Sequence, residues 1–191
     1  IGNTGINNYD NESSQIHASG MVIHEFCEKP SNWRSTKTLE EFLVEEKVIA
    51  ISGINTRKLT SLLRDKGSMN SCIASLSQIT EEEAVKRAKG FTGLKGLDLA
   101  KVVSSKEDYD WNEGVWPEHA VSSNEPLIVA YDFGIKTNIL RLLSDHVGTV
   151  RVVNAETTFE EVLQLSPNGI FLSNGPGDPE PCTYAIENIK K

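Results

Sequence analysis

The last third of the sequence alternates short apolar runs with amphipathic segments, and this alternation restricts the fold more than any other feature of the chain. Strands are predicted at 127–131, 149–154 and 169–173, and helices at 136–144, at 159–165 and from residue 182 onward. Three strand–helix units with short connections predict a parallel, doubly wound sheet, because parallel neighbours need a crossover that a helix supplies. Such sheets bind ligands beyond the carboxyl ends of their strands.

The N-terminal half predicts a separate domain of mixed α/β structure. Helices are expected to begin near Thr38, Asn55 and Thr80, because each of these side chains can accept a hydrogen bond from an unpaired backbone amide. Thr38 and Glu41 have the spacing of a capping box, and Thr56 could replace Asn55 as a cap. Short β-rich runs predict strands at 20–26, 48–52 and 70–76.

A polar, acidic stretch separates the two predicted domains and is typical of a linker. Trp111 and Trp116 within it predict that it lies against a surface, because an exposed indole leaves its apolar area in water. The chain begins with Ile1 and ends inside a predicted helix, so we expect a piece of a longer protein. The predicted organisation is an N-terminal domain lacking its start at 1–104, a linker at 105–126, and a truncated doubly wound domain at 127–191.

A sheet that stops after three strands is expected to expose apolar faces that further strands and helices would cover. We therefore expect residues 127–191 in isolation to be marginally stable or to aggregate.

Composition excludes several classes of function. The net charge of −8 argues against nucleic acid as a main partner, because binding phosphates requires a basic patch. No apolar run approaches the roughly 18 residues of a membrane span, so no membrane partner is expected. The three cysteines, Cys27, Cys72 and Cys182, are widely spaced, which predicts reduced thiols in the cytoplasm. The spacing of the cysteines and of the four histidines, His17, His24, His119 and His146, predicts no metal site.

The third predicted strand runs into a loop rich in glycine and proline, Asn174-Gly-Pro-Gly-Asp-Pro179. Residue types alone favour an ordinary turn between a strand and a helix. However, Gly175 and Gly177 leave their backbone amides open to a ligand, and Pro176 between them stiffens the loop, as an oxyanion site requires. The expected position at the carboxyl edge of a parallel sheet favours a binding site.

The first predicted strand ends in Asp132-Phe-Gly134, which is expected at the same edge of the sheet. Asp132 could orient a ligand or cap the next helix, and Gly134 permits a tight turn. We expect Lys136 and Arg141 to be solvated helix charges. Cys182 has no strand-to-helix elbow and no histidine after it, so we expect a small buried residue and not a nucleophile.

Taken together, these segments resemble the small, glutamine-hydrolysing chains of carbamoyl-phosphate synthetases. The resemblance covers nearly the whole chain, through IGNTGIN (1–7), ESSQIHASGMVI (12–23), TRKLTSLLRDKG (56–67), GLKGLDLAK (93–101), VAYDFGIKTNILR (129–141) and GIFLSNGPGDPEPC (169–182). Several of these stretches belong to an N-terminal domain that other glutamine amidotransferases lack. The family usually has Asp where this chain has Asn55, and either residue can cap a helix.

The resemblance implies that the second domain has the class I glutamine amidotransferase fold. In the family, the cysteine nucleophile lies on a later G-x-C-x-G elbow and is assisted by a His-Glu pair, and a serine from an earlier segment helps to bind glutamine. We therefore expect no catalytic residue within these 191 residues and no glutamine hydrolysis by this piece alone. Gly175 and Gly177 carry over as residues that bind glutamine through backbone contacts, with one amide helping to form the oxyanion hole.

The resemblance also implies a partner, the large chain of the synthetase, in a heterodimer or a higher oligomer. That chain uses ATP and magnesium to make carbamoyl phosphate for arginine and pyrimidine synthesis, and no cofactor is expected in these 191 residues. Two alternatives stay open: a non-catalytic docking module on a doubly wound sheet, or another class I amidotransferase. The N-terminal half weakens the second alternative.

Overall fold

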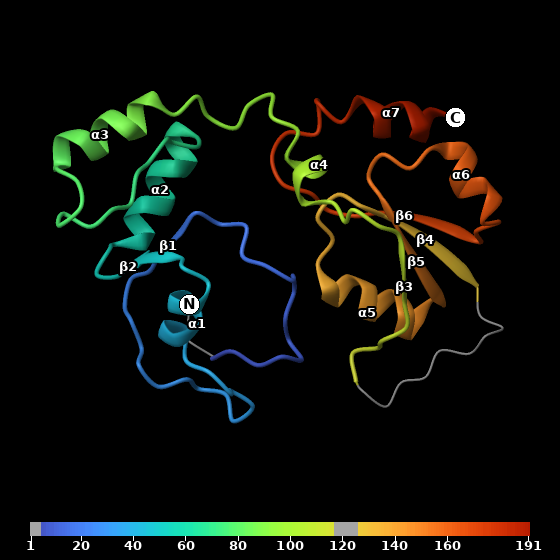
Figure 1. Ribbon diagram of the computed structural model, residues 1–191, viewed down its shortest axis with the longest axis horizontal. Helices are drawn as coiled ribbons and strands as arrows, with labels where there is room; N and C mark the ends of the chain where they lie inside the picture. The colour runs from blue at the N-terminus through green and yellow to red at the C-terminus, as the bar shows by residue number, and fades with distance from the viewer. Residues whose placement is uncertain (1–4, 117–125) are drawn as a thin grey trace. The chain divides into compact units, whose positions relative to one another are not determined.

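The computed structural model of the protein describes residues 5–116 and 126–191 (Figure 1). The chain divides into two compact units, Ile1–Gly93 and Leu94–Lys191, and each unit contains its own sheet. This division falls at Gly93, whereas the sequence pattern placed a boundary at residue 104. The assignment of 1–104, 105–126 and 127–191 to domains and a linker stays a prediction. The first four residues of the predicted N-terminal domain lie outside the described residues, as does His119.

The first unit contains short helices and a small parallel sheet. Its elements are β1 (Gly20–Val22), α1 (Leu39–Glu45), β2 (Ile49–Ile51), α2 (Thr56–Lys66) and α3 (Glu81–Gly90). Thr38, Asn55 and Thr80 cap the three helices as predicted, with the capping box of Thr38 and Glu41 complete. Each such cap contributes about 1 kcal/mol to helix stability.

The predicted strand at 70–76 is wrong, because this run has no strand assignment. Strand β1 instead pairs in parallel with β2, in the register Gly20 to Ile49. Ile73 reaches the sheet through its side chain, whose Cδ1 lies 3.1 Å from where a Cβ on Gly20 would stand. The run therefore packs onto the sheet without adding a hydrogen-bonded strand to it.

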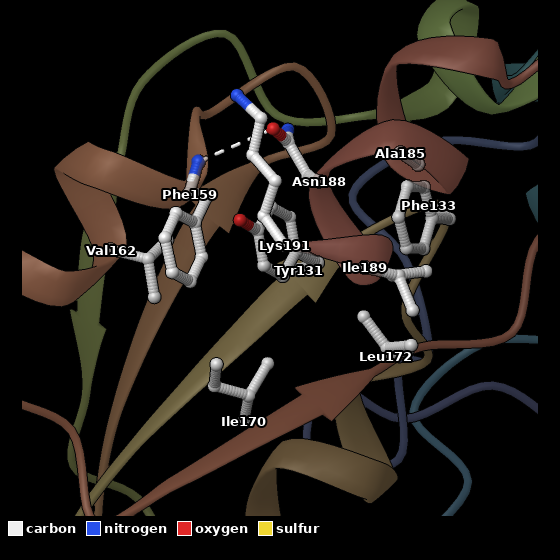
Figure 2. A pocket seen from close by; sticks show the side chains of 10 residues that line it. All are labelled: Tyr131, Phe133, Phe159, Val162, Ile170, Leu172, Ala185, Asn188, Ile189 and Lys191. Atoms are coloured by element: carbon white, nitrogen blue, oxygen red, sulfur yellow. Dashed lines mark hydrogen bonds between the residues drawn. The ribbon is translucent and has the colours of Figure 1, made fainter.

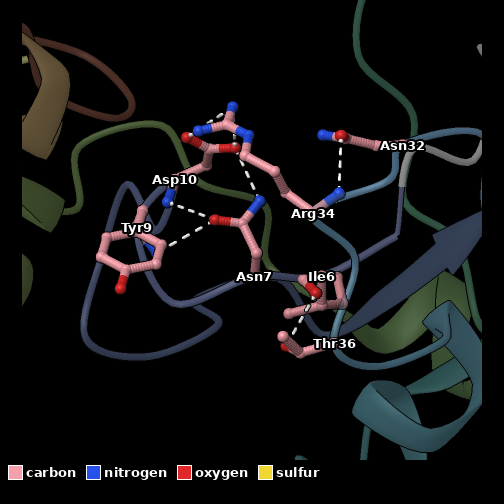
Figure 3. Close-up of polar contacts among 7 residues, drawn as sticks. All are labelled: Ile6, Asn7, Tyr9, Asp10, Asn32, Arg34 and Thr36. Atoms are coloured by element: carbon pink, nitrogen blue, oxygen red, sulfur yellow. Dashed lines mark hydrogen bonds and ion pairs between the residues drawn. The ribbon is translucent and has the colours of Figure 1, made fainter. Parts of the chain in front are cut away.

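A polar network around Asn7 orders the N-terminal loop of this unit (Figure 3). Asn7 is only 5% exposed, and its Oδ1 accepts hydrogen bonds from the amides of Tyr9 at 3.0 Å and Asp10 at 3.1 Å. Its Nδ2 donates to Asp10 Oδ2 at 2.6 Å, and Arg34 forms an ion pair with the same carboxylate at 3.1 Å. Because every polar atom of the Asn7 side chain is paired, its burial carries little desolvation cost.

The second unit is a four-stranded sheet in the order β3-β5-β4-β6. Strands β4 (Leu127–Asp132), β5 (Thr149–Asn154) and β6 (Gly169–Leu172) are parallel, and β3 (Tyr109–Trp111) is antiparallel to β5. The helices are α4 (Leu99–Val103), α5 (Thr137–His146), α6 (Phe159–Gln164) and α7 (Thr183–Lys190). The predicted mixed α/β class and parallel sheet are confirmed. No helix among the described residues has the length and apolar character to span a membrane.

Both faces of the sheet carry apolar side chains, as the alternation along its strands requires. On one face, Val129, Tyr131 and Val153 pack with Val162 of α6. On the other face, Ala130, Val150 and Val152 pack with Leu140 of α5. Figure 1 shows α5 on one side of the sheet and α6 and α7 on the other. Among the three parallel strands, the chain starts at β4, moves outward to β5 and returns to β6 on the other side of β4, so the strand order reverses at β4.

The stretch predicted as a linker contains an edge strand of the sheet. Tyr109 pairs with Val152 and Trp111 with Val150, and both aromatic side chains pack against the buried cluster on that face. Trp111 therefore lies against a surface, as predicted. The same expectation is wrong for Trp116, whose side chain is 70% exposed.

The opposite edge of the sheet leaves apolar side chains open to solvent. Ile170 and Leu172 of β6 are 51% and 43% exposed, and they lie on the same face as Val129 and Tyr131 of β4. An edge strand with exposed apolar side chains favours association with other chains.

We predict that residues 127–191 expressed alone are marginally stable or aggregate, whereas residues 94–191 give a clear thermal unfolding transition. The shorter segment lacks β3 and α4, so Val150, Val152 and Ala185 lose apolar neighbours while the β6 edge stays open. Circular dichroism melts and light scattering on both segments would test this. A sharp cooperative melt of monomeric 127–191 would contradict this prediction. Aggregation of both segments would show that the exposed β6 edge, and not the loss of β3 and α4, causes the association.

Candidate functional site

The glycine-rich loop at 174–179 lies at the carboxyl edge of the sheet, beside the turn that follows β4. The Nδ2 of Asn174 donates a hydrogen bond to the Gly134 carbonyl at 3.2 Å. The Ser173 hydroxyl accepts from the Phe133 amide at 2.9 Å and donates to the Asn174 carbonyl at 2.8 Å. The structure thus brings together the two strand ends that the sequence pattern placed at one edge, at the point where the strand order reverses.

Both glycines of the loop are required by the local packing. A Cβ on Gly175 would stand 2.7 Å from the Phe133 carbonyl oxygen, which leaves no room for any side chain. Gly177 has φ +75°, in the left-handed region, and a Cβ there would stand 3.0 Å from Leu99 Cδ1. The presence of glycine at these positions is therefore explained by the fold, and a ligand role has to rest on other features of the loop.

One such feature is the state of the backbone amides. Gly175 and Gly177 are both exposed, and their amides donate no hydrogen bond to any residue that the structure describes. Pro176 between them restricts the backbone, so the two donors are held without being used. Unpaired amides on a stiff loop can bind a carbonyl oxygen or a developing oxyanion.

The loop forms one wall of a groove of about 280 Å³. The rest of the lining includes Phe133 and Ala100, together with Cys182 at the N-cap of α7 and Ala185 and Ile189 on that helix. A groove of this size is near the lower limit of small-molecule sites. The arrangement combines an apolar wall with hydrogen-bond donors on one side.

A second pocket of about 270 Å³ lies between α6, α7 and the sheet (Figure 2). Its lining is mainly apolar, and its polar side chains have partners: Asn188 binds the carbonyl of Thr157 at 3.0 Å and the amide of Phe159 at 3.3 Å, and Lys191 pairs with Glu160 at 3.3 Å. Because this pocket offers no open donor comparable to the loop amides, the candidate chemistry belongs to the groove beside the glycine loop.

Asp132 has a structural task at this edge. It is 6% exposed, and its Oδ1 accepts hydrogen bonds from the amides of Gly134 at 2.8 Å and Ile135 at 2.9 Å. Its Oδ2 accepts from the Ser105 amide at 2.8 Å. The sequence left two roles open for Asp132, orienting a ligand or capping the next helix. In the structure its carboxylate instead holds the turn before α5, and Lys136 occupies the cap position of that helix without a side-chain hydrogen bond.

Within the second unit, the groove lining does not include Lys136, Arg141 or His146. Lys136 is exposed, as expected of a solvated charge, and Arg141 is half-buried. Within residues 5–116 and 126–191, no group of three or more His, Cys, Asp or Glu side chains is arranged to hold a metal ion.

Cys182 is buried, as predicted, with 8% of its surface exposed. Its thiol lies 3.7 Å from Asp98 Oδ1, and the Tyr184 hydroxyl donates to the same oxygen at 3.4 Å. Burial raises the pKa of the Cys182 thiol, and the nearby Asp98 carboxylate adds to this effect. Burial likewise raises the pKa of Tyr184. A protonated, enclosed thiol is a poor nucleophile.

Sequence reasoning missed Ser173 and Ala100, which line the groove, and also Asp98 and Leu99, which lie beside Ala100 at the start of α4. Asp98 caps α4 by accepting from the Lys101 amide at 3.0 Å. A capping residue directly before two apolar residues was the available signal, but nothing local indicates which surface such a short helix covers.

We predict that iodoacetamide alkylates exposed Cys27 at least about ten times faster than Cys182 at pH 8, because the thiolate is the reactive form and burial both raises the pKa of Cys182 and restricts access. Mass spectrometry of peptides from the natively labelled chain measures the two rates. In denaturing urea the rates should converge, which serves as the control. Equal rates in the native chain would show that Cys182 is accessible and reactive.

Comparison with known proteins agrees with this architecture. Residues 1–73 match the family model for the carbamoyl-phosphate synthase small chain, CPSase domain, and residues 129–191 match the model for class-I glutamine amidotransferases. The carbamoyl phosphate synthase small chain of Vibrio parahaemolyticus is 52% identical over 100% of this chain and 52% of its own length. The small chain of Vibrio cholerae is 52% identical over 98% of this chain and 51% of its own length, and that of Pseudomonas putida is 50% identical over 100% and 52%.

The chain thus spans about half the length of the curated relatives it matches. The two matched stretches occur in the order expected from the resemblance, and the second includes the glycine-rich loop. By its sequence, the chain is about half identical to carbamoyl phosphate synthase small chains over almost its whole length, and its two matched stretches follow the models for the small-chain CPSase domain and for class-I glutamine amidotransferases.

Proposed function

We propose that the protein forms the oxyanion-binding half of a glutaminase that supplies ammonia for carbamoyl phosphate synthesis. The observation that carries this proposal is the pair of exposed amides at Gly175 and Gly177, which have no partner among the described residues and lie on a stiff loop beside a groove. The loop lies within the stretch that matches class-I glutamine amidotransferases. Glutamine is the proposed substrate, bound to this loop through backbone contacts.

The chemistry assigns the loop a defined task. A cysteine thiolate attacks the side-chain amide carbon of glutamine, and the carbonyl oxygen becomes an oxyanion that a loop amide stabilises. The intermediate collapses with release of ammonia, after the leaving nitrogen has received a proton, and water then cleaves the γ-glutamyl thioester to glutamate. One oxyanion donor contributes roughly 10²–10³ in kcat to reactions of this type.

The attacking thiolate does not come from these 191 residues. Cys27, Cys72 and Cys182 all lie outside a G-x-C-x-G pattern, and the thiol of Cys182 is enclosed beside Asp98. The nucleophile and its His-Glu pair belong to sequence supplied in addition to these residues, and the chain by itself does not hydrolyse glutamine. Losing a covalent nucleophile is not offset by a remaining loop.

The proposed partner is the large chain of the synthase, in a heterodimer or a higher oligomer in the cytoplasm. In this assignment the complex is a ligase that serves arginine and pyrimidine synthesis. The large chain binds ATP and magnesium, and the 191-residue chain binds neither. Residues 1–73 match a domain named for the carbamoyl-phosphate synthase small chain. This match supports the large chain of that synthase as the partner, and it weighs against the partner of another class I amidotransferase.

We predict that the 191-residue chain alone shows no glutaminase activity, whereas a chimera is active. In the chimera, this chain replaces the matching part of the V. parahaemolyticus small chain and is paired with the large chain of that organism. Glutamate release and carbamoyl phosphate formation are measured with glutamine and, separately, with ammonia. A chimera that forms carbamoyl phosphate from ammonia but not from glutamine would contradict the proposed role. Binding of an unrelated partner without any activity would favour a docking module.

We predict that Gly177→Val in this chimera lowers glutamine-dependent kcat by at least about 100-fold, because the left-handed backbone is strained and the oxyanion donor is displaced. Ammonia-dependent synthesis should survive. Gly96→Val is the matched control: Gly96 has φ +78° in the same unit but no atom within 4 Å of its Cβ position, so it introduces similar strain away from the groove. Equal loss of both activities in Gly177→Val would indicate misfolding and leave the loop without the proposed role.

A further inference from the structure

The short helix α4 contacts the glycine-rich loop although it lies outside both stretches matched by the family models, residues 1–73 and 129–191. We use the name α4 segment for residues 98–105. The side chain of Leu99 lies next to Gly177: its Cδ1, Cγ and Cβ are 3.0, 3.5 and 3.7 Å from the position of a Cβ on that glycine. Ala100, the next residue, is 4% exposed and lines the groove.

The N-terminal end of the α4 segment is tied to the residues that follow the loop. Asp98 Oδ1 accepts hydrogen bonds from the Lys101 amide at 3.0 Å, the Tyr184 hydroxyl at 3.4 Å and the Cys182 thiol at 3.7 Å. One carboxylate oxygen therefore joins the first turn of α4 to the first turn of α7. Beside it, Ala100 packs with Cys182 and Ala185 in a buried cluster.

The C-terminal end of the α4 segment is tied to the turn on which the loop rests. The Ser105 amide donates to Asp132 Oδ2 at 2.8 Å, and the other oxygen of that carboxylate binds the Gly134 amide at 2.8 Å. Val103 Cγ2 lies 2.8 Å from the position of a Cβ on Gly134. The Gly134 carbonyl in turn accepts the hydrogen bond from Asn174, at the start of the loop.

These contacts support a loop whose two glycine amides have no hydrogen-bond partner among the described residues. Because the amides of Gly175 and Gly177 have no partner among the described residues, the position of the loop has to come from contacts with its neighbours. The outer face of α4 is open, with Val102 74% exposed, so the helix is not held on both sides as a core helix would be. Its inner face is occupied by the loop and the start of α7.

We propose that the α4 segment positions the oxyanion loop, with Leu99 and Asp98 as positioning residues that act on Gly177 and on the start of α7. Neither residue lines the groove beside the loop. The catalytic consequence rests on the proposed function, but the mechanical claim, that the α4 segment holds the loop amides in place, concerns the chain itself.

The first test uses the 191-residue chain and ¹⁵N NMR relaxation. In Leu99→Ala, the order parameters of the Gly175 and Gly177 amides should fall from about 0.85 to below about 0.6, while those of β4 and β5 stay unchanged. Val102→Ala removes an exposed apolar side chain from the same helix and should leave all of them unchanged. Unchanged loop order parameters in Leu99→Ala, or equal changes in both variants, would overturn the proposal.

Asp98 is tested by truncation and by a conservative replacement. Asp98→Ala should loosen the loop, whereas Asp98→Asn should restore its order, because an asparagine oxygen still caps α4 and accepts from Cys182 and Tyr184. Tyr184→Phe removes one donor with little risk to folding and should give a smaller loosening. If Asp98→Ala and Tyr184→Phe both leave the loop rigid, Asp98 has no positioning role.

The chimeric enzyme provides the catalytic readout. Leu99→Ala and Asp98→Ala should lower glutamine-dependent kcat by about tenfold or more with KM changed by less than about threefold, since a displaced donor weakens transition-state binding most. Ammonia-dependent synthesis and the Val102→Ala control should be unaffected. An inactive parent chimera would count against the proposed function, and the NMR result would still decide the role of the α4 segment. A flexible loop with unchanged kcat would overturn the catalytic part.

Discussion

The buried carboxylate of Asp132 holds together the parts of the chain that form the candidate site. It lies at the end of the central strand β4 and accepts three backbone hydrogen bonds, from Ser105, Gly134 and Ile135. A buried carboxylate is costly to desolvate, and hydrogen bonds from several amides offset that cost because they are charge-assisted. Through these bonds one side chain connects β4, the turn that supports the glycine-rich loop, and the segment that follows α4.

At this sheet edge, the groups that hold the structure together differ from the groups that are open to a ligand. Structural groups with acceptor or donor capacity, such as Asp132, Asn174 and the Cys182 thiol, are engaged by neighbours, whereas the amides of Gly175 and Gly177 have no partner among the described residues. A loop whose own amides are unpaired needs external support, because unpaired backbone groups contribute nothing to its rigidity. The close contacts of Phe133 with Gly175 and of Leu99 with Gly177 supply that support.

Local features of the sequence were sufficient for much of the fold. The caps at Thr38, Asn55 and Thr80 and the short apolar runs of β4 and β5 are short-range signals, and the structure agrees with them. The failures concern segments whose state depends on distant partners. Tyr109–Trp111 is polar enough to resemble a linker and becomes a strand because β5 offers a free edge, whereas residues 70–76 have strand-like composition but no strand assignment. Whether a run with strand-like composition becomes a strand depends on an available edge, which periodicity does not reveal.

The class of the fold, the family, and the loop at which to look for a site all follow from the order of amino acids, because hydrophobic period, glycine and proline placement, and the family-like stretches are properties of neighbouring residues. Three further facts emerge only when the elements pack: the loop amides are unpaired among the described residues, Asp132 binds backbone, and Leu99 of α4 lies against Gly177. The contacts behind them join residues as distant along the chain as Leu99 and Gly177, and no local pattern encodes which distant segments will meet.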